Sequence, residues 1–376
     1  MLDSLGINPW VRGEIYAATL PGNWEWAVLS GVEEVARLLE GLPVDVESAP
    51  EGSAFHAGDP VVTVAGRYRD FAVYETAFLG LLCQASGVAT RAARCRLRAG
   101  DRMLYSFGAR RMHPAVAPMI ERSAFIGGCD GVAVVKSAEL IGERAVGTMS
   151  HSLILSVGDE AEAYRGFDRA MDPQVRRVAL IDTFQDEKFG ALTAAEALGE
   201  KLAAVRLDTP RSRRGNFLQI IKETRWELDM RGYDKVGIFV SGGLDEEEVD
   251  RLRPYVQGYG VGTAISNAPV VDFSFDLIEV GVEPRAKRGK MSGNKILWRC
   301  PRCLTTLITA SGEKAPPSPP VHFGVPMESL RKEIVRQGKV EELPPPQDIR
   351  RYCLEQLSLL EAGEPHEEPS RRPSHD

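Results

Sequence analysis

The sequence of 376 residues lacks most features that mark secreted, membrane-bound or nucleic-acid-binding proteins. Its cysteines number only six and are spread along a long chain, which excludes a disulfide framework and is typical of a reducing compartment. It has no run of about 18 apolar residues and no basic segment followed by an apolar one at its start, so neither a membrane span nor a signal peptide is expected. A basic excess is also missing, because the formal net charge is −7 and the isoelectric point is near 5.6. We therefore expect a cytoplasmic protein without nucleic-acid or membrane partners.

What is present is ordinary globular composition, 43% hydrophobic and 26% charged, for which two or three domains are expected. Two β-like runs and a long apolar-periodic helix predict an α+β sandwich domain over residues 1–102. Short buried-type strands then alternate with helices over residues 103–275, which predicts an α/β fold with an incomplete (β/α) TIM-like barrel. A small C-terminal extension over 276–361 is expected to contain a strand, a Cys-x-x-Cys piece and two polar helices, before a disordered tail over 362–376.

The expected strand ends of the barrel are rich in reactive and small residues. In this architecture the carboxyl ends of the strands form one rim, where active sites lie. The predicted ends read FGARR (107–111), GGCDG (127–131), GTMSH (147–151), IDTFQDEK (181–188), RLDTP (206–210), VSGGLD (240–245) and GVGT (260–263).

The last two of these ends predict a phosphate site. Gly242 and Gly243 precede one helix, and Gly262 and Thr263 precede another. Such turns offer free backbone N–H groups at helix starts with no side chains in the way. The alternative is that these glycines only serve tight turns.

Asp182 and Asp208 each end an apolar strand, where a buried carboxylate needs a cation, a diol or a basic partner. Asp208 could instead cap a helix. Arg110, Arg111 and Arg206 bring guanidinium groups suited to carboxylate or phosphate, although arginines in loops are often only solvated. Together the rim describes a site for a phosphorylated sugar and a small anion.

With these residues in view, the chain resembles the nicotinate phosphoribosyltransferases, and in particular their archaeal-type branch. The resemblance covers roughly residues 10–300 and is carried, in order, by PEGSAFHAGDPVVTVAG, ETAFLGLLCQASGVATRAA, FGARR, GTMSHSLI, LIDTFQDEK, VRLDTP, VSGGLD and GVGT. It implies an enzyme that joins nicotinate to 5-phosphoribosyl 1-pyrophosphate (PRPP), giving nicotinate mononucleotide and pyrophosphate in NAD biosynthesis. It further implies coupling to ATP hydrolysis through a phosphorylated histidine, which in this chain is His151.

The same resemblance assigns the other site residues. Asp182 and Asp208 would hold the ribose or the Mg²⁺-bound diphosphate. The pyridine ring would stack between Phe107 and Tyr16 of a second subunit, which implies a homodimer or a higher homo-oligomer with shared active sites. The remaining assignments are Thr148 and Arg206 at nicotinate, Arg110 near its carboxylate or the pyrophosphate, and Gly242, Gly243, Gly262 and Thr263 at the 5′-phosphate.

Two positions depart from the family pattern. Asp130, in GGCDG, falls where related nicotinamide-using enzymes read the amide with an acid, and it would repel a carboxylate unless a cation intervenes. Relatives carry a four-cysteine zinc knuckle, whereas here only Cys300 and Cys303 lie close together. Cys353 and His322 would complete a zinc site only if the fold brings them in.

Three alternatives stay open: a quinolinate phosphoribosyltransferase, a nicotinamide phosphoribosyltransferase, and a non-catalytic nucleotide-binding relative. Quinolinate has two carboxylates and requires a denser cluster of Arg and Lys. That family also lacks a GTxxHS segment, so GTMSHS argues against it. His113 and His56 have no setting comparable to that of His151, and we interpret them as structural or surface residues.

Overall fold

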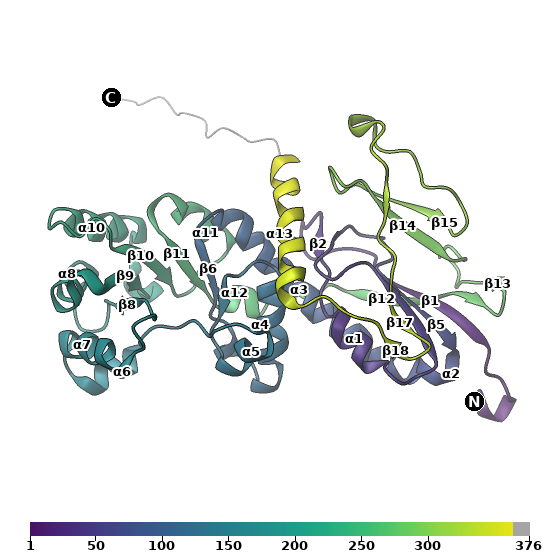
Figure 1. The fold of residues 1–376 in the computed structure, drawn as a ribbon, viewed down its shortest axis with the longest axis horizontal. Helices are drawn as coiled ribbons and strands as arrows, with labels where there is room; N and C mark the ends of the chain where they lie inside the picture. The colour runs from purple at the N-terminus through teal and green to yellow at the C-terminus, as the bar shows by residue number, and fades with distance from the viewer. Residues whose placement is uncertain (364–376) are drawn as a thin grey trace. The chain divides into compact units, whose positions relative to one another are not determined.

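The computed structural model describes residues 1–363, and they divide into two compact units (Figure 1). Unit 1 contains residues 1–86 together with the chain from Val270 onward, and unit 2 contains Gly87–Pro269. This division differs from the expected succession of domains at 1–102, 103–275 and 276–361, because the chain after 270 returns to the first unit. The expected disordered tail lies, from residue 364 onward, outside the described residues.

Unit 2 is built on a six-stranded parallel sheet in the order β7-β6-β11-β10-β9-β8. Consecutive strands separated by helices and paired in parallel form the predicted incomplete barrel, so the α/β class is confirmed. Eight strands would close a barrel, and this sheet stays open between β7 and β8. The strands are β6 (Met103–Ser106), β7 (Gly131–Val132), β8 (Arg177–Leu180), β9 (Leu202–Leu207), β10 (Gly237–Ser241) and β11 (Gly258–Val261).

One predicted barrel strand is wrong. Residues 145–149, AVGTM, form no strand, although the Val146 N–H donates to the Val132 carbonyl at 2.8 Å. Gly147 and the small residues beside it leave this segment as an extended loop along the short β7. This loop lies along β7 at the open edge of the sheet and leads into α6.

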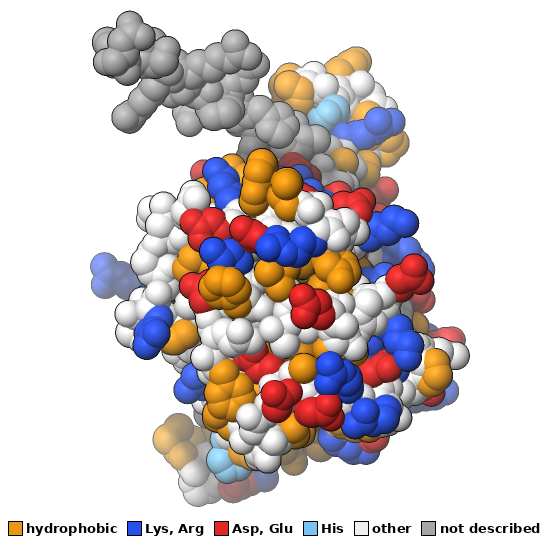
Figure 2. Space-filling model, turned by 90° about the vertical axis from the view of Figure 1, so that its left-hand side faces the viewer, with side chains coloured by type: hydrophobic (Ala, Val, Ile, Leu, Met, Phe, Trp, Pro, Cys, Tyr) orange, Lys and Arg blue, Asp and Glu red, His pale blue; other side chains and the backbone are white. Residues whose placement is uncertain are grey.

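Helices cover the outer face of this sheet, and one apolar core lies between the two layers (Figure 1). Leu104, Val205, Ile238 and Tyr259 from the strands are fully buried there beside helix residues such as Tyr164. The helices are α4 (Ala117–Ile126), α5 (Val135–Leu140), α6 (His151–Val157), α7 (Glu160–Ala170), α8 (Glu187–Leu198), α9 (Arg211–Arg214), α10 (Phe217–Asp229), α11 (Glu246–Leu252) and α12 (Thr263–Ser266), with short 3-10 turns η3 (Ala109–Arg111), η4 (Pro114–Val116), η5 (Gly199–Lys201) and η6 (Arg253–Tyr255). On the face shown in Figure 2, acidic and basic side chains are interspersed rather than gathered by sign.

Unit 1 is built on a seven-stranded antiparallel sheet in the order β13-β12-β1-β5-β3-β17-β18. Alternate residues of these strands, such as Val44 and Val46 in β3, point into a core shared with α1 and the first half of α3. The strands are β1 (Trp10–Ala17), β3 (Val44–Ser48), β5 (Val62–Arg67), β12 (Phe273–Val280), β13 (Glu283–Pro284), β17 (Lys332–Arg336) and β18 (Lys339–Val340); the helices are η1 (Asp3–Leu5), α1 (Val32–Leu38), α2 (Tyr68–Phe71), η2 (Ala72–Tyr74) and α3 (Glu75–Ala99).

Two smaller sheets and a last helix complete unit 1. β2 (Ala27–Val28) pairs with β4 (Ala54–Phe55), and β14 (Lys295–Arg299) lies between β15 (Thr306–Ala310) and β16 (Glu328–Ser329). Only one of the two predicted polar helices exists among the described residues, α13 (Pro346–Gly363). The other is the β17–β18 hairpin, whose turn has positive φ at Gln337 (46°) and Gly338 (78°), as a two-residue hairpin turn requires.

The helical run Tyr68–Ala99 is long and apolar enough to cross a membrane by length and composition alone. Its apolar residues have another use in the structure. Phe71, Phe78 and Leu82 are buried in the core of unit 1, and Ala92 and Cys95 are buried in the core of unit 2. We therefore interpret it as a core helix.

Candidate active site

His151 is the centre of a polar cluster at the carboxyl ends of β8 and β9. It is the first residue of α6, and Ser150 caps this helix by accepting the Leu153 N–H. Its Nε2 lies 3.8 Å from Asp182 Oδ1 and 3.7 Å from Asp208 Oδ2, while Nδ1 is 3.0 Å from the Thr183 hydroxyl. The structure thus brings together the histidine and the two aspartates that the sequence singled out. The imidazole is 38% exposed, so a ligand can reach it.

Asp182 is the buried member of this cluster. Its side chain is 4% exposed, its Oδ2 accepts the Asp208 N–H at 3.0 Å, and its Oδ1 has no hydrogen-bond partner among the described residues. Burial raises the pKa of this carboxyl to about 6, the His151 charge lowers it, and the neighbouring Asp208 raises it further. A buried acceptor left without a partner points to a cation or a proton that belongs there.

Arg206 and Phe107 form the next part of the site, inside the half barrel. The Arg206 guanidinium donates to the Met149 carbonyl at 3.1 Å and lies over the Phe107 ring, 6.0 Å from its centroid. Its Nε is buried without an acceptor among residues 1–363, and burial lowers the pKa of this arginine. Thr148, next to Met149, is half-buried. These groups can offer a planar anion an aromatic face and an unsatisfied cationic donor.

These residues line a cavity of about 680 Å³ within unit 2. Thr148, Phe107 and Arg206 lie on its wall with Tyr105 and Phe239, whose rings are stacked 5.9 Å apart. The volume exceeds what a single pyridine ring fills, so the ring must be held by specific contacts rather than by overall fit.

The two glycine turns differ in geometry. Gly242 and Gly243 follow β10 with φ of 82° and 65°, values that side chains rarely adopt. A Cβ on Gly242 would also lie 2.7 Å from Asp208 Oδ1. Gly262 instead has negative φ and accepts two N–H groups of α12, while Thr263 is exposed at the start of that helix. The Gly242 turn therefore lies beside the carboxylate cluster, and it has a backbone conformation that favours glycine.

Arg110 and Arg111 lie outside this cluster of close contacts. Both are exposed in η3, and the charge of Arg110 reaches Arg206 strongly enough to lower the pKa of the latter. Their side chains are free to turn toward an anion that enters from solvent.

The predicted placement of Asp130 on the rim is wrong. Asp130 precedes β7 instead of following a strand, and its carboxylate accepts the Leu104 N–H at the start of β6 while pairing with Arg96. Both contacts are at the amino ends of the parallel strands, opposite to the rim that carries His151. Asp130 is thus a structural residue, and the expected repulsion of a substrate carboxylate does not arise from it.

Tyr16 belongs to unit 1, in β1. Its hydroxyl donates to Asp276 Oδ2 at 2.5 Å, and Lys290 lies over its ring at 4.5 Å. Lys287 also contacts Asp276, at 2.5 Å. The tyrosine is 8% exposed in the single chain. Its contacts with Asp276 and Lys290 hold the ring in one orientation.

Several residues that support the site were missed from the sequence. Buried Glu160 accepts the Phe184 N–H and the Gln185 side chain, which fixes the loop after β8. Arg214 lies 8% exposed beside the Gly242 turn. The run PRSRR directly after RLDT was the available signal, but an arginine cluster in a loop does not show which member turns inward.

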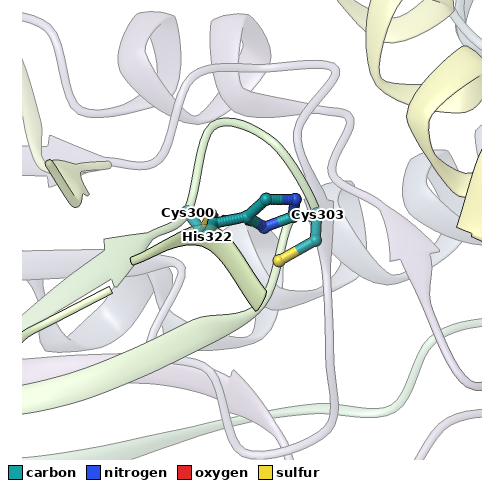
Figure 3. A group of neighbouring side chains, drawn as sticks. All are labelled: Cys300, Cys303 and His322. Carbon is teal, nitrogen blue, oxygen red and sulfur yellow. Dashed lines mark hydrogen bonds between the residues drawn. The ribbon is translucent and has the colours of Figure 1, made fainter. Parts of the chain in front are cut away.

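A separate cluster of metal-binding residue types lies in unit 1 (Figure 3). Cys300 and Cys303 are in the turn between β14 and β15, and His322 comes from the 3-10 turn η7 (Pro320–His322). Their ligand atoms all lie within 4.8 Å of one another, with Cys300 Sγ 3.6 Å from His322 Nδ1. Cys353 is not in this group: it is buried in α13, with its Cβ 3.5 Å from the position of a Cβ built on Gly52. The fold has therefore brought in one of the two further ligands considered from the sequence.

Comparisons with known proteins identify the relatives of this chain. Models of the quinolinate phosphoribosyl transferase family match residues 2–86 (N-terminal domain) and 88–276 (C-terminal domain). A nicotinate phosphoribosyltransferase of Mycobacterium tuberculosis is 28% identical over 372 residues, covering 87% of this chain and 80% of the relative. The crystal structure of nicotinate-nucleotide pyrophosphorylase from Pyrococcus furiosus is 51% identical with a TM-score of 0.92, covering 96% of this chain and 92% of that one. Human nicotinic acid phosphoribosyltransferase shares the fold at a TM-score of 0.75 and 21% identity, with coverage of 96% and 92%.

Proposed function

Because the chain belongs to the quinolinate phosphoribosyltransferase family and is an enzyme of the nicotinate phosphoribosyltransferase type, we propose that it couples nucleotide formation to ATP hydrolysis. In this proposal nicotinate and PRPP give nicotinate mononucleotide and pyrophosphate, as a step of NAD biosynthesis. The observation that carries it is the cluster of His151, Asp182 and Asp208 beside the Gly242 turn.

The residues present suit the phosphoribosyl transfer. The nucleophile is a neutral pyridine nitrogen that carries no proton, so the enzyme needs no strong base at this step. It needs alignment of the ring with the anomeric carbon and stabilisation of the departing charge. In this proposal Phe107 and Arg206 orient nicotinate, with Thr148 beside them, and the exposed Arg110 and Thr263 contact the entering anions. The Gly242 and Gly262 turns would receive the 5′-phosphate.

His151 is proposed to accept the γ-phosphoryl group of ATP. The P–O bond to ADP breaks, a P–N bond to the imidazole forms, and water later cleaves that bond to release phosphate. The Thr183 hydroxyl fixes the ring through Nδ1, so Nε2, which faces the two carboxylates, is the nitrogen that would accept the phosphoryl group.

Asp182 and Asp208 also fit a bound Mg²⁺. Their carboxylate oxygens are the hard donors that this ion prefers, and Asp182 Oδ1 is buried without a partner among residues 1–363. When bound, Mg²⁺ would offset the charge of the pyrophosphate and of the ATP phosphates. The proposed role of the two aspartates is to hold that ion and the ribose hydroxyls.

A substrate panel tests the function. Purified enzyme with PRPP and Mg²⁺ is offered nicotinate, nicotinamide or quinolinate, each with and without ATP, while mononucleotide and ADP are measured together. We expect turnover with nicotinate, stimulated by ATP, and ADP release in step with product. Turnover of quinolinate alone would contradict the proposal. Formation of mononucleotide without any ADP release would contradict its coupling to ATP hydrolysis.

We further propose a cytoplasmic homodimer, or a higher homo-oligomer, in which Tyr16 of one subunit completes the site of another. Tyr16 is held rigidly by Asp276 and Lys290, which suits a side chain that must present one aromatic face. Tyr16 lies in unit 1, whereas all the other residues assigned to the substrates lie in unit 2, and the family resemblance is the reason for assigning it to a shared site.

A zinc ion with three protein ligands is proposed at Cys300, Cys303 and His322, and its fourth position is left to a ligand that these residues do not supply. Two thiolates and one imidazole form a donor set typical of zinc, and the Cys300–His322 distance fits neighbouring ligands of a tetrahedral ion. Metal analysis of the purified protein should find zinc near one equivalent, and Cys303→Ser should lower both the zinc content and the unfolding temperature. A wild-type protein without zinc that unfolds at the same temperature with and without a chelator would contradict this assignment.

A further inference from the structure

The loop after β10 is held from one side by two arginines of α9. Arg214 donates through Nε to the Thr209 carbonyl at 3.1 Å and through Nη2 to the carbonyls of Ser241, at 3.2 Å, and Gly242. Arg211 donates to the next carbonyl along the chain, that of Gly243, at 3.0 Å. Three consecutive carbonyls, 241 to 243, are therefore turned toward guanidinium groups.

This arrangement decides where the amide protons of the loop point. In a trans peptide the C=O of one residue and the N–H of the next point in opposite directions, and the described chain has no cis peptide bond. The N–H groups of Gly242, Gly243 and Leu244 must then face away from the two arginines. Among residues 1–363, the N–H groups of Gly243 and Leu244 donate to no protein acceptor, whereas that of Gly242 faces the Gly260 carbonyl across the β10–β11 pairing. Successive free N–H groups of this kind form an anion-binding nest.

We infer that Arg214 and Arg211 are positioning residues that orient the amides of Gly243 and Leu244 for the 5′-phosphate of PRPP. The inference rests on the proposed function and extends it to side chains that need not touch the substrate. Neither arginine was assigned from the sequence, and the usual expectation for arginines beside a phosphate would be direct contact.

The burial of Arg214 supports a positioning role rather than direct contact. It is 8% exposed, its guanidinium carbon lies 4.2 Å from the Phe217 ring centroid, and its bonds from Nε and Nη2 go to backbone carbonyls. A lysine could donate to one of these carbonyls, but it could not reach both the Thr209 carbonyl after β9 and the Ser241 carbonyl at the end of β10. The planar guanidinium group of an arginine spans the two. Asp208 strengthens the same loop by accepting the Ser241 hydroxyl at 2.8 Å.

The test compares two ligands that differ only in the 5′-phosphate, nicotinate mononucleotide and nicotinate riboside. Their dissociation constants are measured by calorimetry for the full-length wild type, Arg214→Lys and Arg211→Ala. Arg213→Ala is the matched control, because Arg213 is an exposed arginine of the same helix. Its substitution removes the same charge as Arg211→Ala does. Arg214→Lys keeps the charge, and the exposed Arg211 can be truncated without opening the core.

We expect the preference for mononucleotide over riboside to fall by about tenfold in Arg214→Lys and by a smaller factor in Arg211→Ala. Riboside affinity should stay within about twofold of wild type, and the KM for PRPP should rise more than that for nicotinate. Arg213→Ala should behave as wild type.

Three results would overturn the inference. The preference could persist in both variants, riboside binding could fall in parallel with mononucleotide binding, or the wild type could bind the two ligands equally, in which case nicotinate transfer stands without this phosphate loop. A wild type that binds neither ligand and forms no mononucleotide overturns the proposed function, and the inference with it.

Discussion

At the scale of single residues, His151 carries the step that separates this proposal from simple phosphoribosyl transfer. His151→Ala should abolish nicotinate-dependent ADP release and lower ATP-stimulated turnover by roughly tenfold or more, while slow transfer without ATP persists. The measurement follows ADP and mononucleotide in the same reaction. His113→Ala is the control, since His113 is exposed and only caps η4. Loss of folding in His151→Ala, seen by circular dichroism, would instead assign a packing role to the ring.

The raised pKa of Asp182 predicts how the stability of the protein depends on pH. Its pKa is about 6 in the fold, against an ordinary value of 3.8, because the site is buried. Between these values the folded chain keeps a proton that the unfolded chain has released, so this group lowers the free energy of unfolding as the pH rises from about 4 to about 6. Asp182→Asn should therefore be more stable than wild type above pH 7, by roughly 2 kcal/mol.

Thermal melts from pH 4 to 8 without Mg²⁺ measure this effect. The difference in Tm between variant and wild type should grow with pH and level off above the folded pKa. A difference that does not change with pH would mean that the carboxyl is already charged throughout this range.

The sequence predicted most residues of the cluster but not how they are supported. Asp182 and Asp208 follow apolar strands, and parallel strands bring their carboxyl ends together, so the proximity of these two residues follows from the pattern. His151 lies beside them although the strand predicted before it does not form. Asp130 was misplaced because β7 has only two residues and is too short for its ends to be recognised. Glu160 and Arg214 were missed because their roles depend on buried bonds to the backbone, which leave no periodic signal.

At the scale of elements, the Gly242 turn requires a residue without a side chain. Gly242→Ala would force a left-handed φ of 82° on alanine and place its Cβ 2.7 Å from Asp208 Oδ1. We expect a loss of about 1–3 kcal/mol in stability and an increase in the KM for PRPP of roughly tenfold. Urea unfolding and initial-rate kinetics measure the two effects.

Gly80→Ala is the matched control for that variant. Gly80 lies in α3, and a Cβ there would meet no atom within 4 Å. Helix propensity alone should make this variant equal to or up to about 1 kcal/mol more stable than wild type, with unchanged kinetics. Equal behaviour of the two variants would mean that the turn tolerates alanine and that its conformation is not required.

Two elements were predicted wrongly. Residues 145–149 have strand-like composition but pair only once with β7, and residues 332–340 have helix-forming charges but fold as a hairpin. In the second case β17 pairs with β3, so tertiary pairing overrides local propensity. The glycine of the Gln337–Gly338 turn was the local clue, because it readily adopts the positive φ of 78° that this hairpin turn requires.

At the scale of the whole molecule, shared active sites predict complementation between two inactive variants. Tyr16→Ala and His151→Ala should each have little ATP-coupled activity. If Tyr16 serves the site of a neighbouring subunit, an equal mixture that exchanges subunits forms mixed dimers with one intact site, and about a quarter of wild-type activity returns. Co-expression with two affinity tags isolates the mixed species. No recovery in a verified mixed dimer would assign Tyr16 to the site of its own chain.

The return of the chain to unit 1 has a consequence for synthesis. Val11 pairs with Val280 and Val46 with Val335, so β1 and β3 are made long before β12 and β17 exist to cover them. A nascent chain therefore carries strand edges open to wrong partners, while the continuous segment 87–269 can already fold. The late strands complete the first unit last, so this protein is most exposed to aggregation between the translation of β5 and the translation of β12 and β17.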